Sequence, residues 1–80
     1  MKEEIEKKLI EKTAKALGVE PDKLSGKTNI KTEVDLKSLE LAGIISELED
    51  EYDCFIKYTE LMHTDTIEQA AEAIAKMLEN

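Results

Sequence analysis

The sequence predicts an all-α fold: a small antiparallel four-helix bundle of three longer helices and one short helix, with a long loop between the first and second helices. Leu, Ile, Ala, Glu and Lys are abundant, whereas tryptophan is absent and only three residues are aromatic, a composition that favours helices over strands. Apolar residues recur at helical spacing in three separate segments. A chain of 80 residues builds one small core, so we expect residues 1–80 to form a single domain.

The first predicted helix runs from about residue 2 to residue 17. Gly18 follows it, at the place where a residue in the left-handed conformation ends a helix. Residues spaced three or four apart form the side of this helix that faces the core. They are Ile5, Leu9, Ile10, Thr13, Ala16 and Leu17.

A long loop is predicted from residue 18 to about residue 36, because Pro21 and Gly26 interrupt the helical periodicity. Loops of this length in small domains are often functional. Scattered apolar residues predict that the loop is pinned onto the helices rather than free. These anchors are Val19, Leu24, Ile30, Val34 and Leu36.

The second predicted helix runs from about residue 38 to residue 52. Its buried face is predicted to hold Leu41, Ile45, Leu48 and Tyr52, with Ile44 at the edge. The opposite, exposed face is predicted to hold Leu39, Gly43, Ser46, Glu47 and Asp50.

The C-terminal part is predicted to hold a connector, a short helix and a last long helix. We expect residues 54–56, Cys-Phe-Ile, to enter the core and residues 58–62 to form the short helix. Either Thr66 with Gln69 or Asp65 with Glu68 is spaced to form a capping box at the start of the last helix. The apolar stripe that follows consists of Ile67, Ala70, Ala71, Ile74 and Leu78.

The charge distribution excludes several classes of function. The formal net charge is -8, and residues 28–80 carry four lysines against thirteen acids. Such a surface repels nucleic acid and anionic membranes and attracts basic protein partners. The single cysteine, Cys54, cannot form an internal disulfide, the acids lack the spacing of a calcium loop, and the N-terminal residues lack the apolar run of a signal peptide or membrane span. We therefore expect a cytoplasmic protein that holds no metal.

Ser38 is the residue most suited to chemistry, because it lies where the loop meets the second helix. A catalytic serine needs a base, but the only histidine, His63, is distant in sequence, and no Gly-x-Ser-x-Gly motif is present, so we do not expect an enzyme. Two roles remain open from the residues alone: a helix N-cap and an attachment point.

The acids of the second helix form a candidate partner-binding surface, although a solvated face is the simpler interpretation. No lysine lies among them, and Glu47 and Glu51 form a like-charge pair one turn apart that costs stability. Uncompensated repulsion of this kind suits a surface that meets a cationic partner. The predicted partner-binding residues are Leu39, Glu40, Glu47, Asp50 and Glu51.

The stretch LKSLELAGIISELEDEYDCFI resembles the modification site and second helix of stand-alone acyl carrier proteins. The likeness extends from Leu17-Gly18-Val19 to Thr66-Ile67-Glu68-Gln69-Ala70. It implies that the Ser38 hydroxyl attacks coenzyme A on a separate synthase and acquires a phosphopantetheine arm, whose thiol carries acyl groups in fatty-acid, polyketide or related metabolism. It also implies a monomer whose partners are a phosphopantetheinyl transferase and acyl-transferring or acyl-elongating enzymes with basic patches. A small aliphatic core would allow the acyl chain to be partly sheltered between the helices.

Two positions depart from the family pattern. Lys37 stands where the family normally has an aspartate that helps to hold magnesium, and Gly43 replaces an acid commonly presented to partners. Lys37 motivates one alternative, an unmodified adaptor that binds a basic partner through its acidic second helix. A peptidyl or aminoacyl carrier and a generic acidic helical bundle are the further alternatives.

Overall fold

The computed structural model describes residues 2–30, 32, 38–61 and 63–79, and four α-helices and one short 3-10 helix make up the regular structure of this part. In chain order the elements are α1 (Lys2–Leu17), η1 (Pro21–Lys23), α2 (Ser38–Tyr52), α3 (Tyr58–Leu61) and α4 (Ile67–Glu79). The predicted all-α bundle of three longer helices and one short helix is confirmed.

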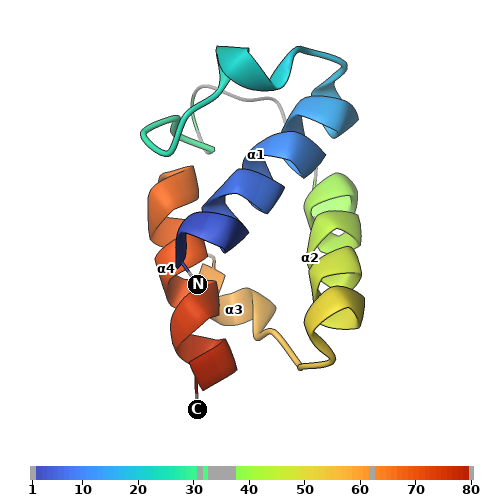
Figure 1. Ribbon diagram of the computed structural model, residues 1–80, viewed down its shortest axis with the longest axis vertical. Coiled ribbons are helices and arrows are strands. Elements are labelled where there is room, and N and C mark those ends of the chain that lie inside the picture. Colours follow the sequence, from blue (N-terminus) through green and yellow to red (C-terminus); the bar gives the residue numbers. More distant parts are fainter. Residues whose placement is uncertain (1, 31, 33–37, 62, 80) are drawn as a thin grey trace.

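The helices surround one apolar core. α2 and α4 run in the same direction, α1 runs in the opposite direction between them, and α3 packs beside α4 (Figure 1). Five side chains are almost completely enclosed, and each stabilises the fold by about 1.5–3 kcal/mol relative to an exposed side chain. They are Ile5, Leu48, Ile56, Ile67 and Ile74.

α1 ends as predicted, at a left-handed glycine. Gly18 has a φ of 73°, its N–H donates to the Lys15 carbonyl (3.3 Å), and the Val19 N–H donates to the Ala14 carbonyl (3.0 Å). These two bonds satisfy carbonyls that the helix itself leaves without partners. The buried face differs from the prediction at one position, because Ala14 is buried whereas Ala16 is exposed beside α2.

The described part of the long loop is attached to the start of α4 through backbone hydrogen bonds. The Ile67 N–H donates to the Thr28 carbonyl (3.1 Å), the Glu68 N–H to the Gly26 carbonyl (2.8 Å), and the Ile30 N–H to the Asp65 carbonyl (2.8 Å). The loop therefore supplies acceptors for the unpaired first amides of the helix.

Only some of the predicted loop anchors contact the core. Leu24 and Ile30 pack against it, as expected. Val19 is 42% exposed, so its predicted anchoring role is wrong, because Val19 continues the turn that ends α1 and its backbone rather than its side chain is tied down. Val34 and Leu36 lie outside the described residues.

α2 has the predicted bounds and the predicted polarity. Ile45 and Leu48 are buried, and Gly43, Ser46, Glu47 and Asp50 are exposed. Ile44, predicted at the edge of the buried face, is only 3% exposed, whereas Leu41 and Tyr52 are partly buried.

The connector after α2 enters the core with one residue rather than three. Ile56 is 2% exposed, and its N–H donates to the Glu49 carboxylate (2.8 Å). Phe55 is 74% exposed and Cys54 is partly buried, so the prediction that all three residues enter the core is wrong. The bond to Glu49 and the burial of Ile56 orient the connector so that the neighbouring aromatic ring faces solvent.

The start of α4 uses one of the two capping boxes that the sequence allows. The Gln69 N–H donates to Thr66 Oγ1 (3.2 Å), and Gln69 Oε1 accepts from the N–H groups of Thr66 (3.3 Å) and Asp65 (2.7 Å). The Gln69 side chain therefore accepts hydrogen bonds from two amides that precede the helix. The stripe of α4 is buried from Ile67 to Ile74, and Leu78 is partly buried.

Candidate functional site: the start of α2 and its contact with α1

Ser38 is the first residue of α2, as the sequence predicts. The first amides of a helix have no partners within the helix, and the helix dipole favours negative charge there. A phosphate ester on a residue at this position is therefore electrostatically compatible with α2. The Lys37 residue and the side chains of Ser38 and Leu39 lie outside the described part of the structure.

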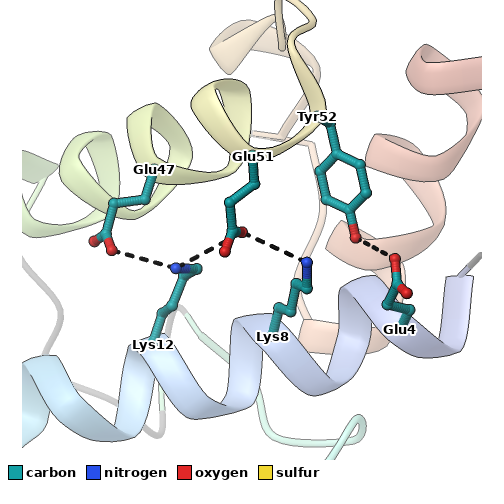
Figure 2. A network of polar contacts seen from close by, with 6 residues as sticks. All are labelled: Glu4, Lys8, Lys12, Glu47, Glu51 and Tyr52. Atoms are coloured by element: carbon teal, nitrogen blue, oxygen red, sulfur yellow. Dashed lines mark hydrogen bonds and ion pairs between the residues drawn. The ribbon is translucent and has the colours of Figure 1, made fainter.

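Two glutamates of α2, Glu47 and Glu51, are paired with lysines of α1 (Figure 2). Lys12 Nζ lies 3.2 Å from Glu47 Oε1 and 3.8 Å from Glu51 Oε2, and Lys8 Nζ lies 3.7 Å from Glu51 Oε2. We call these four residues the α1–α2 charge ladder. Its formal charges sum to zero, so the prediction that the repulsion between Glu47 and Glu51 is uncompensated is wrong.

A second polar contact joins the same helices at the far end of α2. The Tyr52 hydroxyl donates to Glu4 Oε2 (2.6 Å), and Lys8 Nζ lies 4.7 Å from the centre of the Tyr52 ring (Figure 2). The hydrogen bond from Tyr52, with the charge of Lys8, holds the pKa of Glu4 below its usual value. Burial, followed by the bond to Glu4, raises the pKa of Tyr52. Near neutral pH, both shifts favour a charged Glu4 carboxylate and a neutral Tyr52 hydroxyl, which are the forms that make this hydrogen bond.

The five predicted partner-binding residues do not form one uniform acidic surface. Glu40, Glu47 and Glu51 line a groove towards α1, whereas Asp50 is exposed and does not line it. The Glu47 side chain remains 62% exposed despite its ion pair. The side chain of Leu39 lies outside the described part of the structure. Among these residues, Asp50 is therefore the acid best placed to meet a partner without competition from α1.

The groove between α1 and α2 has a volume of about 530 Å³. The α1 side carries Lys8, Lys12 and Lys15 together with Glu11, and the α2 side carries the three glutamates named above. Ala16, Gly43 and Ile44 also line the groove, and a Cβ atom added to Gly43 would have no other residue within 4 Å. The groove is thus open beside Gly43, with three lysines and one glutamate on the α1 side and three glutamates on the α2 side.

The lysines of this groove were not among the sequence-predicted site residues. Lys8, Lys12 and Lys15 are spaced by four and three residues, so they share one face of α1. Matching that basic face to the acids of an antiparallel neighbour would have found the ladder. The prediction considered charge pairs only within each helix, and Lys12 is 35 residues away from Glu47.

The interior between the helices is nearly filled. A space of about 20 Å³ lies among apolar residues that include Leu41, Ile45 and Leu61, and it has room for about one water molecule. An acyl chain sheltered here, as the sequence suggests, requires the helices to move apart.

Other candidate chemistry is sparse. No cluster of three or more His, Cys, Asp and Glu side chains that could hold a metal occurs among the described residues. None of the helices in the described part of the chain is both long and apolar enough to cross a membrane. His63 is exposed, and Cys54 is a free thiol that is partly buried.

Residues 7–74 match the family model for the phosphopantetheine attachment site, and the chain belongs to this family. The match runs from α1 to α4 and confirms the resemblance to acyl carrier proteins at the level of the family. Phosphopantetheine bound covalently is the cofactor that this family implies. A comparison with curated proteins gives no match.

Proposed function

We propose that this chain is an acyl carrier protein and that Ser38 is the residue that receives the phosphopantetheine arm. The observation that carries the proposal is the position of Ser38, at the first residue of α2 and inside the range that matches the attachment-site family. The described surroundings fit a phosphate ester, because helix α2 begins there and its first amides favour an anion.

The chain's part in the reaction is to supply a hydroxyl. Ser38 Oγ attacks the phosphorus that bears the pantetheine group in coenzyme A, and an O–P bond forms while the bond between the two phosphates breaks. The nucleotide leaves, and the serine proton passes to a base on the separate transferase. When bound, the arm supplies a thiol that holds acyl groups as thioesters. Catalysis belongs to the partner enzymes, and His63 lies exposed beyond α3.

The partner surface centres on the exposed side of α2. The α1–α2 charge ladder is neutral as a unit, so long-range attraction of a basic partner comes from acids outside it. Asp50 is such an acid, and it is exposed on α2. The acidity of this helix favours an acyl carrier over a peptidyl or aminoacyl carrier, which is the related alternative.

An unmodified adaptor is the second candidate, and Lys37 is the observation that favours it. A cation stands directly before Ser38, where the acyl carrier proteins that the chain resembles have a metal-binding aspartate. In the adaptor, the α2 surface binds a basic partner and Ser38 keeps a free hydroxyl.

Intact-mass measurement separates these candidates. The chain is incubated with coenzyme A, magnesium and a broad-specificity phosphopantetheinyl transferase, alongside Ser38→Ala and Lys37→Asp. The acyl carrier proposal expects the parent chain to gain one phosphopantetheine and Ser38→Ala to gain none. A gain restricted to Lys37→Asp would favour the adaptor.

A further inference from the structure

A second groove, of about 720 Å³, runs along α4, between this helix and the segment that holds the connector and α3. Its α4 side is lined by residues spaced three or four apart, so they share one face of the helix. They are Gln69, Glu72, Ala73, Lys76 and Met77. The opposite side is lined by Phe55, Lys57 and Glu60. None of these residues belongs to α2, so this groove is separate from the surface proposed to meet partner enzymes.

Phe55 supplies an exposed aromatic ring at this groove, on a backbone that is held in place. The residue is 74% exposed. The two amides that follow it are bonded to two different helices, because the Ile56 N–H donates to Glu49 on α2 (2.8 Å) and the Lys57 N–H donates to Met77 Sδ on α4 (3.3 Å). An aromatic side chain on a fixed backbone loses little freedom on binding and is a frequent anchor of protein interfaces.

The charges that line the α4 groove balance each other. Lys57 and Lys76 oppose Glu60 and Glu72, whereas the whole chain has a net charge of -8. Lys76 Nζ lies 3.6 Å from Glu72 Oε1, and these side chains are 73% and 52% exposed. A surface with both signs in equal number is suited to an isologous contact, in which each residue lies opposite a different residue of an identical chain.

We propose that the α4 groove binds a second copy of this chain, with the two α4 helices antiparallel about a two-fold axis. An antiparallel pair centred at the level of Ile74, midway between positions 72 and 76, places Glu72 of each copy opposite Lys76 of the other. The four charges then alternate in sign, and the ion pair within each chain is kept. A parallel pair would place Glu72 opposite Glu72, so the charges select the antiparallel arrangement.

The remaining lining residues fit this contact. Ala73 lies next to the centre of the pair, and its small side chain allows the helices to approach. Phe55 and Met77 supply apolar area, and methionine adapts readily to the surface that it meets. Exposed ion pairs add little affinity, and one groove is small beside the interface of a stable dimer, so we expect a dissociation constant of about 0.1–1 mM. Dilute chain is then monomeric, as the resemblance implies.

Sedimentation equilibrium of the chain and two charge variants tests the proposal. In about 0.15 M sodium chloride, where charges are screened beyond about 8 Å, the average mass of the parent should rise as its concentration approaches about 2 mM. Lys76→Glu and Glu72→Lys alone should each associate at least about tenfold more weakly, because each change places like charges opposite one another twice. An equal mixture of the two variants should restore the association, because each glutamate of one chain then faces a lysine of the other.

The controls separate this contact from net charge and from folding. Lys7→Glu and Glu79→Lys make the same charge changes outside the groove, so both should associate like the parent. Glu72→Lys changes the net charge from -8 to -6 and so reduces overall repulsion, which means that its weaker association cannot come from net charge. Phe55→Ala should weaken association about tenfold while its melting temperature stays near that of the parent.

Two results would overturn the proposal. One is a parent chain that stays monomeric up to about 2 mM, and the other is a mixture that associates no more than its two components do alone. A monomeric parent whose Phe55→Ala variant binds the transferase more weakly would assign the groove to the partner enzyme. None of these results bears on whether Ser38 receives the arm.

Discussion

Phe55 and Ile56 are neighbours with opposite environments, one 74% exposed and the other 2% exposed. Ile56→Ala leaves a cavity in the core and should lower the free energy of unfolding by about 2–5 kcal/mol. Phe55→Ala should change it by no more than about 0.5 kcal/mol, because the ring has little contact to lose. Urea unfolding followed by circular dichroism measures both variants. Equal losses would show that Phe55 packs in the core, as the sequence suggested.

Tyr52 and Glu4 form a hydrogen bond that depends on a charged carboxylate. The pKa of Glu4 is lowered from 4.5 on folding, so the stabilisation is present above that pH and is lost as the pH falls through the lower folded value. Tyr52→Phe should therefore reduce the urea midpoint at neutral pH, and the difference from the parent should shrink in acid.

The control for this pH dependence is Tyr58→Phe, which makes the same chemical change on α3. Its urea midpoint should change with pH in parallel with that of the parent. A constant difference between Tyr52→Phe and the parent from about pH 7 to pH 3 would mean that the charge of Glu4 does not contribute to the bond.

At the scale of elements, Lys12 is the centre of the contact between α1 and α2. Its side chain is only 18% exposed and reaches two carboxylates. Lys12→Met keeps an apolar stem but removes the charge, and it should lower the free energy of unfolding by about 0.5–1 kcal/mol at low salt. Glu47 then loses its lysine partner on α1, and Lys8 alone offsets the repulsion between Glu47 and Glu51.

Lys15→Met is the matched control, because Lys15 is exposed on the same helix. It should lose less stability than Lys12→Met. The gap between the two variants should narrow in about 1 M sodium chloride, where charges are screened within about 3 Å. A gap that does not depend on salt would assign the effect of Lys12 to packing instead of charge.

Local signals account for what the sequence predicted well. The bounds of α1 and α2 follow from apolar periodicity, a terminal glycine and the start of a helix after a polar loop, all of which act within a few residues. The choice of capping box depended on where the Gln69 side chain turns, which spacing alone does not determine.

Contacts between segments that are distant in the sequence account for the features that the sequence did not predict. The charge ladder joins residues more than thirty positions apart, and Phe55 faces solvent because Glu49 and the core fix its neighbour Ile56. These outcomes depend on how helices are placed against each other, and hydrophobic periodicity carries no information on that placement.

At the scale of the whole molecule, the net charge is -8, but the acids of α2 do not contribute equally to the negative charge that a partner meets. The charge ladder neutralises Glu47 and Glu51, whereas Asp50 remains exposed. Asp50→Lys should therefore weaken association with a basic phosphopantetheinyl transferase, mainly by slowing the association rate at low salt. Surface plasmon resonance at several salt concentrations measures this effect.

Glu79→Lys makes the same change in net charge at the far end of α4 and serves as the control. It should slow association less than Asp50→Lys does. Equal effects of the two variants would mean that the partner responds to the total charge of the molecule and not to α2.

Ser38 is the proposed attachment residue, and fragmentation mass spectrometry of the transferase product tests this role most directly. After proteolysis, the added phosphopantetheine should be found on the peptide that contains Ser38, and the fragment ions should place it on that serine. An added group on any other residue, or a parent chain that gains no mass under conditions in which Lys37→Asp does, would contradict this role.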